Sequence, residues 1–554
     1  MKKPILVFLM FFVVAAKAQP VSLRTDVLVD SLMAIQPYAV KIDYDSATTS
    51  LHYITFSGNV YQIIEEPGQP LRDTLIADEN LHGINYLQGF VFKDSMLFVC
   101  GNHKSPSVPG YGIVACGVLQ PDGSRMWHNV VTTSIYPSSA VLYDHAFSSI
   151  IVNAAGDSLI FASGARTDHG EIESTNGLYP NTRDVPLTTK LFTVPITAQN
   201  LCLPNDENAL DSMGVIFAHG VRNTFDMAYD KDDQLFGVEN SGDRDDPEEI
   251  NWLRQNHHYG FPWQMGGHVT PMQFIGYDAT LDLLINHNSL AWGNNCFYND
   301  STYPIMPASL NITQPVRNFG PDADKYRDEL TGNVMDASDN GTFLTTFTSH
   351  RSPLGIMFDR YSKLGDNLTG DGFVMSYTKG TMDSTGTLPD NTTGPFVDLG
   401  EDLLHLQMSY NTAQDNYDIT ATKIVTNFAS PVDACLVGHV MYTLEIGINA
   451  PSIIRVLTFP PNTSGIKNNS IEITTKIFPN PSSDKFYLQL NAPFSKDTFS
   501  VSIRHISGKQ TPQTNFKQIS ESMLLVNCSH LKPGMYVVKV TKGNLSENLK
   551  LIIH

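Results

Sequence analysis

The sequence predicts an all-β protein: a six-bladed β-propeller followed by a small immunoglobulin-like β-sandwich. Three observations predict it. A pair of short apolar strands around a polar turn recurs six times, no long amphipathic helical pattern intervenes, and a Pro- and Asn-rich stretch precedes a second group of short strands. A lone strand pair cannot bury both faces, so such units stack radially. A double-layer sandwich is the alternative, and the long, uneven spacing of the pairs disfavours it.

The N-terminus resembles a secretory signal. A basic start precedes an apolar run over residues 5–14, and Ala16 and Ala18 occupy the positions that determine cleavage. The run is shorter than the roughly 20 residues that a membrane-spanning helix needs, and no later segment is long and apolar enough. We therefore expect a signal peptide over residues 1–18 and an exported mature protein without a transmembrane segment.

Six repeated units define the predicted propeller, residues 19–458. Each unit has alternating apolar residues on either side of a turn rich in Asp, Asn, Gly or Ser. The units begin at Ala39, Gly89, Ser149, Asp226, Gly355 and Asp433. A linker is predicted over residues 459–470, where Pro, Asn, Ser and Gly cluster.

The last stretch, residues 471–554, resembles the C-terminal sorting domain of the type IX secretion system. The resemblance rests on Pro479-Asn480-Pro481, Gly508, Pro533-Gly534, Tyr536 and the basic final strand with Lys550. It implies passage across an outer membrane, with the type IX machinery as a partner and a secreted or surface-attached product. An ordinary immunoglobulin-like appendage that binds a sugar or a surface is the alternative.

Composition limits the partners. The formal net charge of −20 excludes nucleic acid and anionic membranes as partners and provides carboxylates for calcium. The six cysteines show no metal-binding spacing. Export permits disulfides, and the sequence leaves open whether Cys100 and Cys116 pair across neighbouring strands.

The Asp144-His145 pair is the first candidate catalytic feature. It precedes the third strand pair, on a loop expected at one mouth of the propeller. A loop histidine by itself is most often a surface or hydrogen-bonding residue. However, imidazole titrates near neutral pH and suits proton abstraction from an alcohol, and Asp144 is adjacent to orient it.

The segment 219–263 contains the second group of candidates. Arg222-Asn223 leads into the fourth strand pair, and a planar guanidinium binds carboxylates with two hydrogen bonds. An isolated arginine would by default brace a blade through a salt bridge. The turn Glu239–Gly242 and an acidic run over residues 243–249 follow. That run is either a second calcium site or a solvated acidic loop.

These motifs together resemble the soluble quinoprotein glucose/sorbosone dehydrogenases. The resemblance implies a pyrroloquinoline quinone and a calcium ion at the propeller mouth, and a sugar or related alcohol as substrate. It implies that His145 is the general base beside Asp144. It further implies that Arg222, Asn223 and Lys379 contact the quinone, and that the carbonyls of Ser241 and Gly242 bind calcium.

One departure from the family stands before the sixth strand pair. The family presents arginines to the quinone there, whereas this sequence has Ala429, Ser430 and Val432. Charged hydrogen bonds contribute roughly 1.5–3 kcal/mol each, so their loss weakens quinone binding unless something replaces them. The sequence leaves open whether Arg351 or Arg360 does so.

Three functions remain open at this point. The first is an exported quinoprotein sugar dehydrogenase. The second is a non-catalytic, calcium-stabilised propeller that binds a glycan or a surface partner, which the missing arginines favour. The third is a calcium-dependent hydrolase of the lactonase kind, in which a central metal activates water. It would need several carboxylates converging on the axis, whereas the sequence concentrates them in one loop.

Overall fold

The computed structural model describes residues 19–105, 108–139, 143–378, 396, 400–462, 476–489, 499–505, 511, 516–520, 522–542 and 545–554. The chain divides into two compact units, Met1–Asn462 and Thr463–His554, which are treated separately below. The predicted signal peptide and residues 463–470 of the predicted linker lie outside the described residues. Within the described part, every helix is too short or too polar to cross a membrane.

Six antiparallel sheets, here called blades 1 to 6, form the first unit. Blade 1 contains β3 (Ala39–Asp45), β4 (Ser50–Thr55), β5 (Val60–Ile64) and β6 (Arg72–Ala77). Blade 2 contains β7 (Tyr86–Lys93), β8 (Met96–Ser105), β9 (Val108–Leu119), β10 (Arg125–Thr133) and β14 (Leu201–Leu203), which pairs in parallel with β10. Blade 3 contains β11 (Phe147–Val152), β12 (Ser158–Ser163), β13 (Lys190–Pro195) and β15 (Ile216–His219). Blade 4 contains β16 (Thr224–Tyr229), β17 (Leu235–Glu239) and β18 (Glu249–Trp252). Blade 5 contains β24 (Pro353–Phe358), β25 (Gly372–Ser376), β26 (Asp402–Asn411) and β27 (Asn416–Thr426). Blade 6 contains β28 (Pro431–Val437), β29 (Val440–Glu445) and β30 (Ser452–Thr458).

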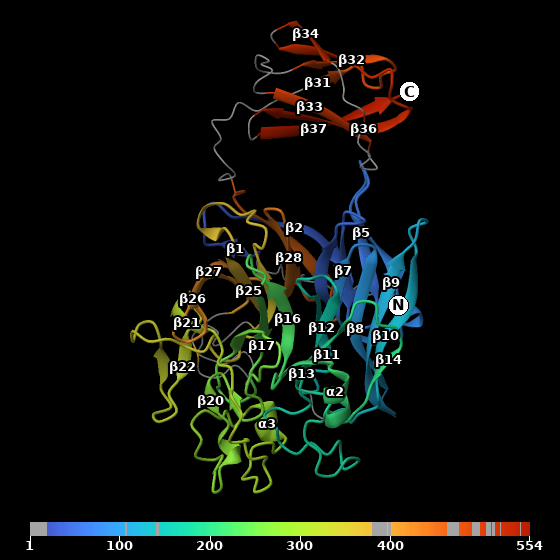
Figure 1. Ribbon diagram of the computed structural model, residues 1–554. Helices are drawn as coiled ribbons and strands as arrows, with labels where there is room; N and C mark the ends of the chain where they lie inside the picture. The colour runs from blue at the N-terminus through green and yellow to red at the C-terminus, as the bar shows by residue number, and fades with distance from the viewer. Residues whose placement is uncertain are drawn as a thin grey trace, which may run out of the picture. The chain divides into compact units, whose positions relative to one another are not determined.

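The blades close into a ring (Figure 1). Their first strands contact one another in the order β3, β7, β11, β16, β24 and β28, and β28 contacts β3 again. Each of the six repeats predicted from the sequence supplies one of these inner strands, so the six-bladed propeller is confirmed. Alternate side chains along the strands are buried between neighbouring sheets. Phe98 of blade 2 and the ring cluster Phe147, Phe161 and Phe192 of blade 3 share one such layer.

The N-terminal strands complete two blades instead of forming their own. β1 (Val21–Ser22) pairs with β27 at the outer edge of blade 5, and β2 (Leu28–Ile35) pairs with β30 at the outer edge of blade 6. The Arg455 guanidinium of β30 also donates to the side-chain oxygen of Gln19, at 2.6 Å. The two ends of the propeller chain are therefore joined through sheet pairing.

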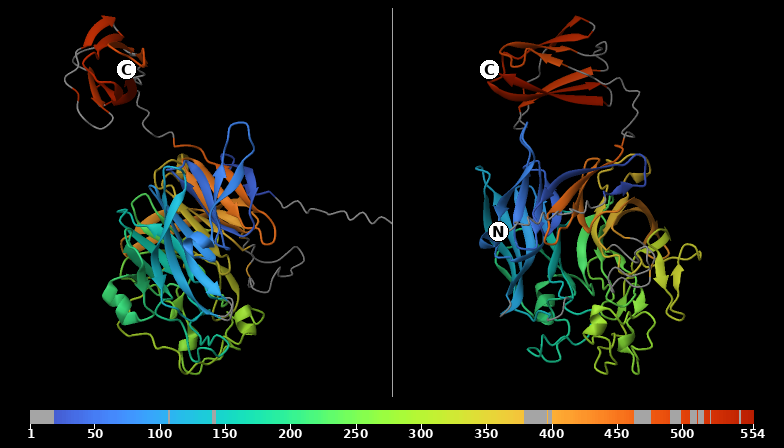
Figure 2. Two further views of the ribbon diagram at one scale, coloured as in Figure 1. Left: turned by 90° about the vertical axis from the view of Figure 1, so that its right-hand side faces the viewer. Right: turned by 180° about the vertical axis from the view of Figure 1, so that it is seen from behind.

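Long connections gather at one end of the ring, as both views of Figure 2 show for the yellow-green segment between β18 and β24. This segment includes the hairpins β19–β20 (Gln264–Met265, His268–Val269) and β22–β23 (Lys325–Arg327, Val334–Asp336), the helix α3 (Leu290–Gly293) and β21 (Arg317–Pro321), which pairs in parallel with β27. Two further helices precede strands of other blades, α1 (Glu79–His82) before β7 of blade 2 and α2 (Glu207–Met213) before β15 of blade 3. The inner strands begin at this end of the ring.

A buried ion-pair cluster crosses the axis of the ring. The Lys41 ammonium of β3 lies 2.9 Å from the Asp226 carboxylate of β16, the inner strand opposite it in the ring. The same ammonium lies 3.3 Å from the Asp433 carboxylate of the neighbouring β28. Three of the six blades therefore share one lysine.

Replacing Lys41 with methionine is expected to lower the free energy of unfolding of the propeller by about 3–5 kcal/mol, because two buried carboxylates lose their partner. Urea denaturation followed by tryptophan fluorescence measures the change. Lys231→Met is the matched control, because the exposed Lys231 forms one ion pair among the described residues, with its neighbour Asp232, and it should change stability by less than about 0.5 kcal/mol. Equal effects of the two substitutions would contradict a special role for the cluster.

The cross-strand disulfide that the sequence left open does not form. All six cysteines are free, and five of them are buried. Cys100 of β8 is paired with Val114 of β9, and Cys116 is paired with Phe98, so the two thiols are offset by two residues along the sheet. Such diagonal neighbours lie about 7–8 Å apart, beyond the Cα separation that a disulfide accepts.

The second unit is a small β-sandwich. One sheet contains β31 (Lys476–Phe478), β32 (Lys485–Gln489), β35 (Met523–Asn527) and β34 (Phe516–Ser520), and the other contains β33 (Phe499–His505), β36 (Gly534–Lys542) and β37 (Leu545–Ile553). Inward-facing residues of both sheets, among them Phe486, Leu524, Val538 and Leu551, form one buried core. The predicted immunoglobulin-like sandwich is thus confirmed as a separate β unit.

Candidate active site at the propeller mouth

His145 lies on the loop that leads into β11, and its ring is partly buried. Its Nδ1 is 3.0 Å from the carbonyl oxygen of Ala165. A carbonyl only accepts, so Nδ1 carries the hydrogen and Nε2 keeps its lone pair. Burial, with the nearby positive charge of Arg222, lowers the pKa of His145 to about 3. The imidazole is therefore neutral at physiological pH and can accept a proton at Nε2.

Asp144 does not orient this ring. Its carboxylate lies 3.3 Å from the Lys104 ammonium, and its Oδ1 is buried with no hydrogen-bond partner among the described residues. The carbonyl of Ala165, twenty positions along the chain, provides the acceptor expected from Asp144. Gln88 of β7 fixes the same loop by donating to the carbonyl of His145 at 2.9 Å. The functional role predicted for Asp144 is thus reduced to a contact with Lys104.

Arg222 is buried and held from three sides. Its Nε donates to the Asp168 carbonyl at 2.7 Å, Nη1 donates to the Asn240 carbonyl at 3.1 Å, and Nη2 lies 3.2 Å from the Asp168 carboxylate. Its backbone N–H donates to the carboxylate of Glu239. Burial raises the pKa of Glu239 to about 7. The guanidinium is therefore positioned before any ligand arrives.

Gly164 brings the His145 and Arg222 segments together. A Cβ at this position would lie 2.5 Å from the Cβ of His145 and 2.9 Å from the carbonyl oxygen of Arg222. No side chain fits there, and the backbone of Ala165 instead donates to that carbonyl at 2.7 Å. The two residues predicted separately from the sequence, the base and the quinone-binding arginine, thus lie at one site.

The turn after β17 supplies the predicted calcium ligands. Asn223 donates to the side-chain oxygen of Asn240 at 2.7 Å, which fixes the start of this turn. Within the described part of the chain, the carbonyls of Ser241 and Gly242 accept no hydrogen bond. A Cβ on Gly242 would lie 2.8 Å from an oxygen of Asp168, so this glycine permits the close approach. Two free carbonyls beside a carboxylate are oxygen donors of the type that calcium prefers.

Sequence reasoning missed the group Asp168-His169-Gly170-Glu171. Asp168 lies between two side chains, with Oδ1 3.2 Å from the Arg222 guanidinium and Oδ2 3.0 Å from Nδ1 of His169. Glu171 accepts hydrogen bonds from the backbone N–H groups of Asp168 and His169, both at 2.9 Å. The His169 ring stacks on Phe297 with centroids 4.6 Å apart. The available signal was two carboxylates and an imidazole within four residues, in a connection too long for a hairpin.

The acidic run after Gly242 is not a solvated loop. Asp245 is buried between Arg327, at 2.9 Å, and His350, at 2.8 Å. Asp246 pairs with Arg244 and lies 3.0 Å from His268. These four partners occupy three carboxylate oxygens, both of Asp245 and Oδ1 of Asp246, that a second calcium ion would need. Through these contacts the run instead holds the connection between β18 and β24 at the mouth of the propeller.

Glu248 is the exception in this run. It is buried, its Oε2 has no hydrogen-bond partner among the described residues, and burial raises its pKa to about 8 despite the nearby charges of His350, Arg351 and Arg222. Three of the further buried side-chain atoms without partners in the described part belong to the adjoining loops: Nδ2 of Asn240, Oγ of Ser241 and Oγ of Ser349. Orphaned polar atoms at such density indicate a site built for a polar ligand.

The far side of the mouth has fewer cations, as the sequence predicted. The backbone N–H groups of Ala429 and Ser430 donate to Glu445 and Glu401. Arg351 is buried near Glu248 and pairs with Asp402 at 2.6 Å. Arg360, the other possible replacement, pairs with Asp233 at the opposite end of the inner strands. Only Arg351 is therefore near the mouth, and Lys379 lies outside the described residues.

The donor set fits the implied groups. Oxygen atoms of Ser241, Gly242 and Glu248 suit calcium, and the Arg222 guanidinium suits a carboxylate or a quinone oxygen. The unpartnered Asn240 and Ser349 side chains would add neutral hydrogen bonds. Of the two arginines that could replace the missing ones, Arg351 is the one that lies near Glu248.

Comparison with known proteins identifies the second unit. A family model described as a secretion system C-terminal sorting domain matches residues 476–554. The chain therefore ends in a sorting domain of the type IX secretion system, as its sequence motifs indicate. This domain marks the protein for export.

No curated protein matches the chain. Solved structures similar to it include the soluble aldose sugar dehydrogenase from Escherichia coli in its apo form, with 14% identity and a TM-score of 0.47 over 78% of this chain and 99% of that one. The PQQ domain of pyranose dehydrogenase from Coprinopsis cinerea, in holo form, has 11% identity and a TM-score of 0.47 over 80% and 99%. The PQQ-bound aldose sugar dehydrogenase from Streptomyces coelicolor has 11% identity and a TM-score of 0.43 over 78% and 99%. Identities of this size assign no role to individual residues.

Proposed function

We propose that this protein is an exported quinoprotein dehydrogenase that oxidises an aldose or a related alcohol at the propeller mouth. The observation that carries the proposal is the convergence of His145 and Arg222 across Gly164. A neutral imidazole with a free Nε2 lies beside a guanidinium that is already fixed by Asp168. A base and a fixed cation at one site match the needs of alcohol oxidation.

We assign the roles as follows. Bound pyrroloquinoline quinone would accept the hydride that leaves the alcohol carbon. Nε2 of His145 accepts the hydroxyl proton, while Nδ1 stays bonded to the Ala165 carbonyl and fixes the ring. Arg222 and Asn223 would bind the quinone, and so would Lys379, which lies outside the described residues. The carbonyls of Ser241 and Gly242 would hold the calcium ion.

A second candidate function is a non-catalytic, calcium-stabilised propeller that binds a glycan or a surface partner. The observation that favours it is the state of Arg222, whose guanidinium already has three protein acceptors. The lack of arginine at Ser430 and Val432 favours it as well. In either case we propose that the sorting domain delivers the propeller through the type IX machinery to the cell surface or the medium.

Calcium removal and quinone titration together test the proposal. Calcium at about 100 times its Kd should stabilise the full chain by about 2.7 kcal/mol, because it binds only the folded state. Calorimetry should show a lower melting temperature in chelator that calcium restores and magnesium does not. Quinone should bind the calcium-loaded protein and support reduction of an artificial acceptor across a panel of aldoses. Calcium stabilisation without quinone binding would replace the first function by the second.

A further inference from the structure

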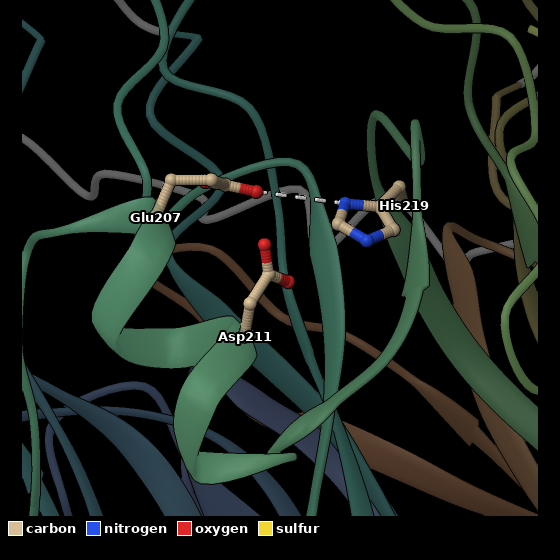
Figure 3. A group of neighbouring side chains, drawn as sticks. All are labelled: Glu207, Asp211 and His219. Carbon is tan, nitrogen blue, oxygen red and sulfur yellow. Dashed lines mark ion pairs between the residues drawn. The ribbon is translucent and has the colours of Figure 1, made fainter.

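A helix and a strand of blade 3 bring a mixed carboxylate and imidazole cluster together, apart from the mouth. Helix α2 starts after Asp206, whose side chain caps it by accepting the N–H of Ala209 at 2.9 Å. Glu207 and Asp211 are four residues apart and so lie on one helix face. Figure 3 shows both side chains directed at the ring of His219, the last residue of β15. One ligand atom from each of the three lies within 4.8 Å of the other two.

Lys190 orients the Glu207 carboxylate within this cluster. Lys190 of β13 is the cross-strand partner of His219, so the two side chains share a face of the sheet. Its ammonium lies 3.0 Å from Oε2 of Glu207, and Oε1 of the same carboxylate lies 3.8 Å from Nδ1 of His219. One carboxylate oxygen is thus anchored, and the other is left for a ligand. Metal sites commonly hold their carboxylates through such an outer partner.

We propose that Glu207, Asp211 and His219 form a binding site for a divalent transition metal of the Zn²⁺ type. Zinc takes imidazole nitrogen and carboxylate oxygen at about 2.0–2.2 Å in tetrahedral geometry, which places its ligand atoms about 3.3 Å apart. Glu207 and His219 are half-buried and Asp211 is exposed, and side-chain rotation would have to bring the three ligand atoms together from at most 4.8 Å, with Oε2 of Glu207 still held by Lys190. Water takes the fourth position.

The charges of the cluster support this assignment. Two carboxylates and one ammonium carry a net charge of about −1, which attracts a dication. Burial, followed by the charge of Lys190, lowers the pKa of His219, so the ring is in its neutral, ligating form at physiological pH. An imidazole ligand favours zinc over calcium, which takes oxygen donors. This site therefore selects a different metal from the one proposed for the mouth.

Metal binding here would tie helix α2 to the strand that leads into the mouth. β15 ends at His219, and two residues, Gly220 and Val221, connect it to Arg222. The N–H of Gly220 donates to the carbonyl of Thr189 at 2.9 Å. The zinc ion would act as a structural clip on this segment. The inference stands whether or not the mouth binds a quinone.

Zinc titration of the full chain tests the site. The protein is stripped with chelator, saturated with calcium to fill the oxygen-rich mouth, and titrated with Zn²⁺ in a calorimeter. We expect one zinc ion per chain in the wild type and in His128→Ala, a control histidine on β10. Asp211→Asn and His219→Ala should weaken the binding more than about tenfold, since even loss of an outer partner costs 10–100-fold. Zinc should also raise the melting temperature of the wild type and of His128→Ala, but not that of Asp211→Asn or His219→Ala.

Asp211 is exposed and belongs to a surface helix, so Asp211→Asn should fold normally and serves as the decisive variant. Equal zinc affinity in the wild type and Asp211→Asn would overturn the proposal. Failure of the calcium-loaded wild type to bind zinc below about 100 µM would overturn it as well. Neither result depends on quinone binding or on dehydrogenase activity.

Discussion

Replacement of His145 with alanine is expected to lower the rate of sugar oxidation by about 10²–10⁴-fold, the contribution typical of a positioned general base. Quinone affinity should stay close to the wild-type value, because the hydrogen bond of the ring goes to the carbonyl of Ala165 and not to a residue proposed to bind the quinone. Steady-state reduction of an artificial acceptor, at saturating calcium and quinone, measures the rate. His439→Ala, in the turn between β28 and β29, is the matched control and should leave the rate unchanged.

The pH profile gives the same substitution a second readout. A base acts only when deprotonated, and a lowered pKa keeps it deprotonated to lower pH. Burial and Arg222 hold the pKa of His145 near 3, so the acid limb of kcat/KM should lie well below pH 6.5, the ordinary value for imidazole. An acid limb near 6.5, or a rate that falls only in parallel with quinone affinity, would contradict the base assignment.

Arg222→Lys is expected to weaken quinone binding by about 10–150-fold, equivalent to one charged hydrogen bond of 1.5–3 kcal/mol. Lysine keeps a positive charge beside Asp168 but loses the planar fork that binds two acceptors at once. Fluorescence titration of the calcium-loaded protein with the quinone measures the affinity. Arg360→Lys, at the other end of the inner strands, should leave it unchanged.

Arg222→Ala should have a larger effect on the fold. It leaves the buried Asp168 carboxylate without the guanidinium that lies 3.2 Å away, and breaking a buried pair in this way costs about 3–5 kcal/mol. The lysine variant therefore separates quinone binding from stability. Unchanged quinone affinity in folded Arg222→Lys would favour the non-catalytic function.

The fold was predictable because its signal is local and repeated. A strand pair such as β11–β12 shows its apolar alternation and its turn within some twenty residues, and the turn is closed by Asn153, whose side chain accepts the N–H groups of Asp157 and Ser158. Six copies of that signal define the blades. The sorting domain was predictable for a different reason, since its motifs alone matched a known family.

The site was only partly predictable because its contacts join distant segments. Asp245 was interpreted as part of a solvated or metal-binding run, and its partners Arg327 and His350 lie more than eighty positions away. Asp168 lies in a connection without strand periodicity, so nothing in the sequence showed that it is buried against Arg222. Adjacency suggested that Asp144 orients His145, but a backbone carbonyl does so. Long-range pairs between charged side chains produce no periodic pattern in the amino-acid sequence.

β1 completes blade 5 and β2 completes blade 6, which has a consequence for folding and for aggregation. Leu28 pairs with Thr458, so neither of the last two sheets is complete until nearly the whole propeller sequence is available. Such non-local pairing slows folding. Proteolysis within residues 19–35 would uncover β30 and the end of β27 together. Open strand edges of this kind join other chains, so cleavage in this segment should make the protein prone to aggregation.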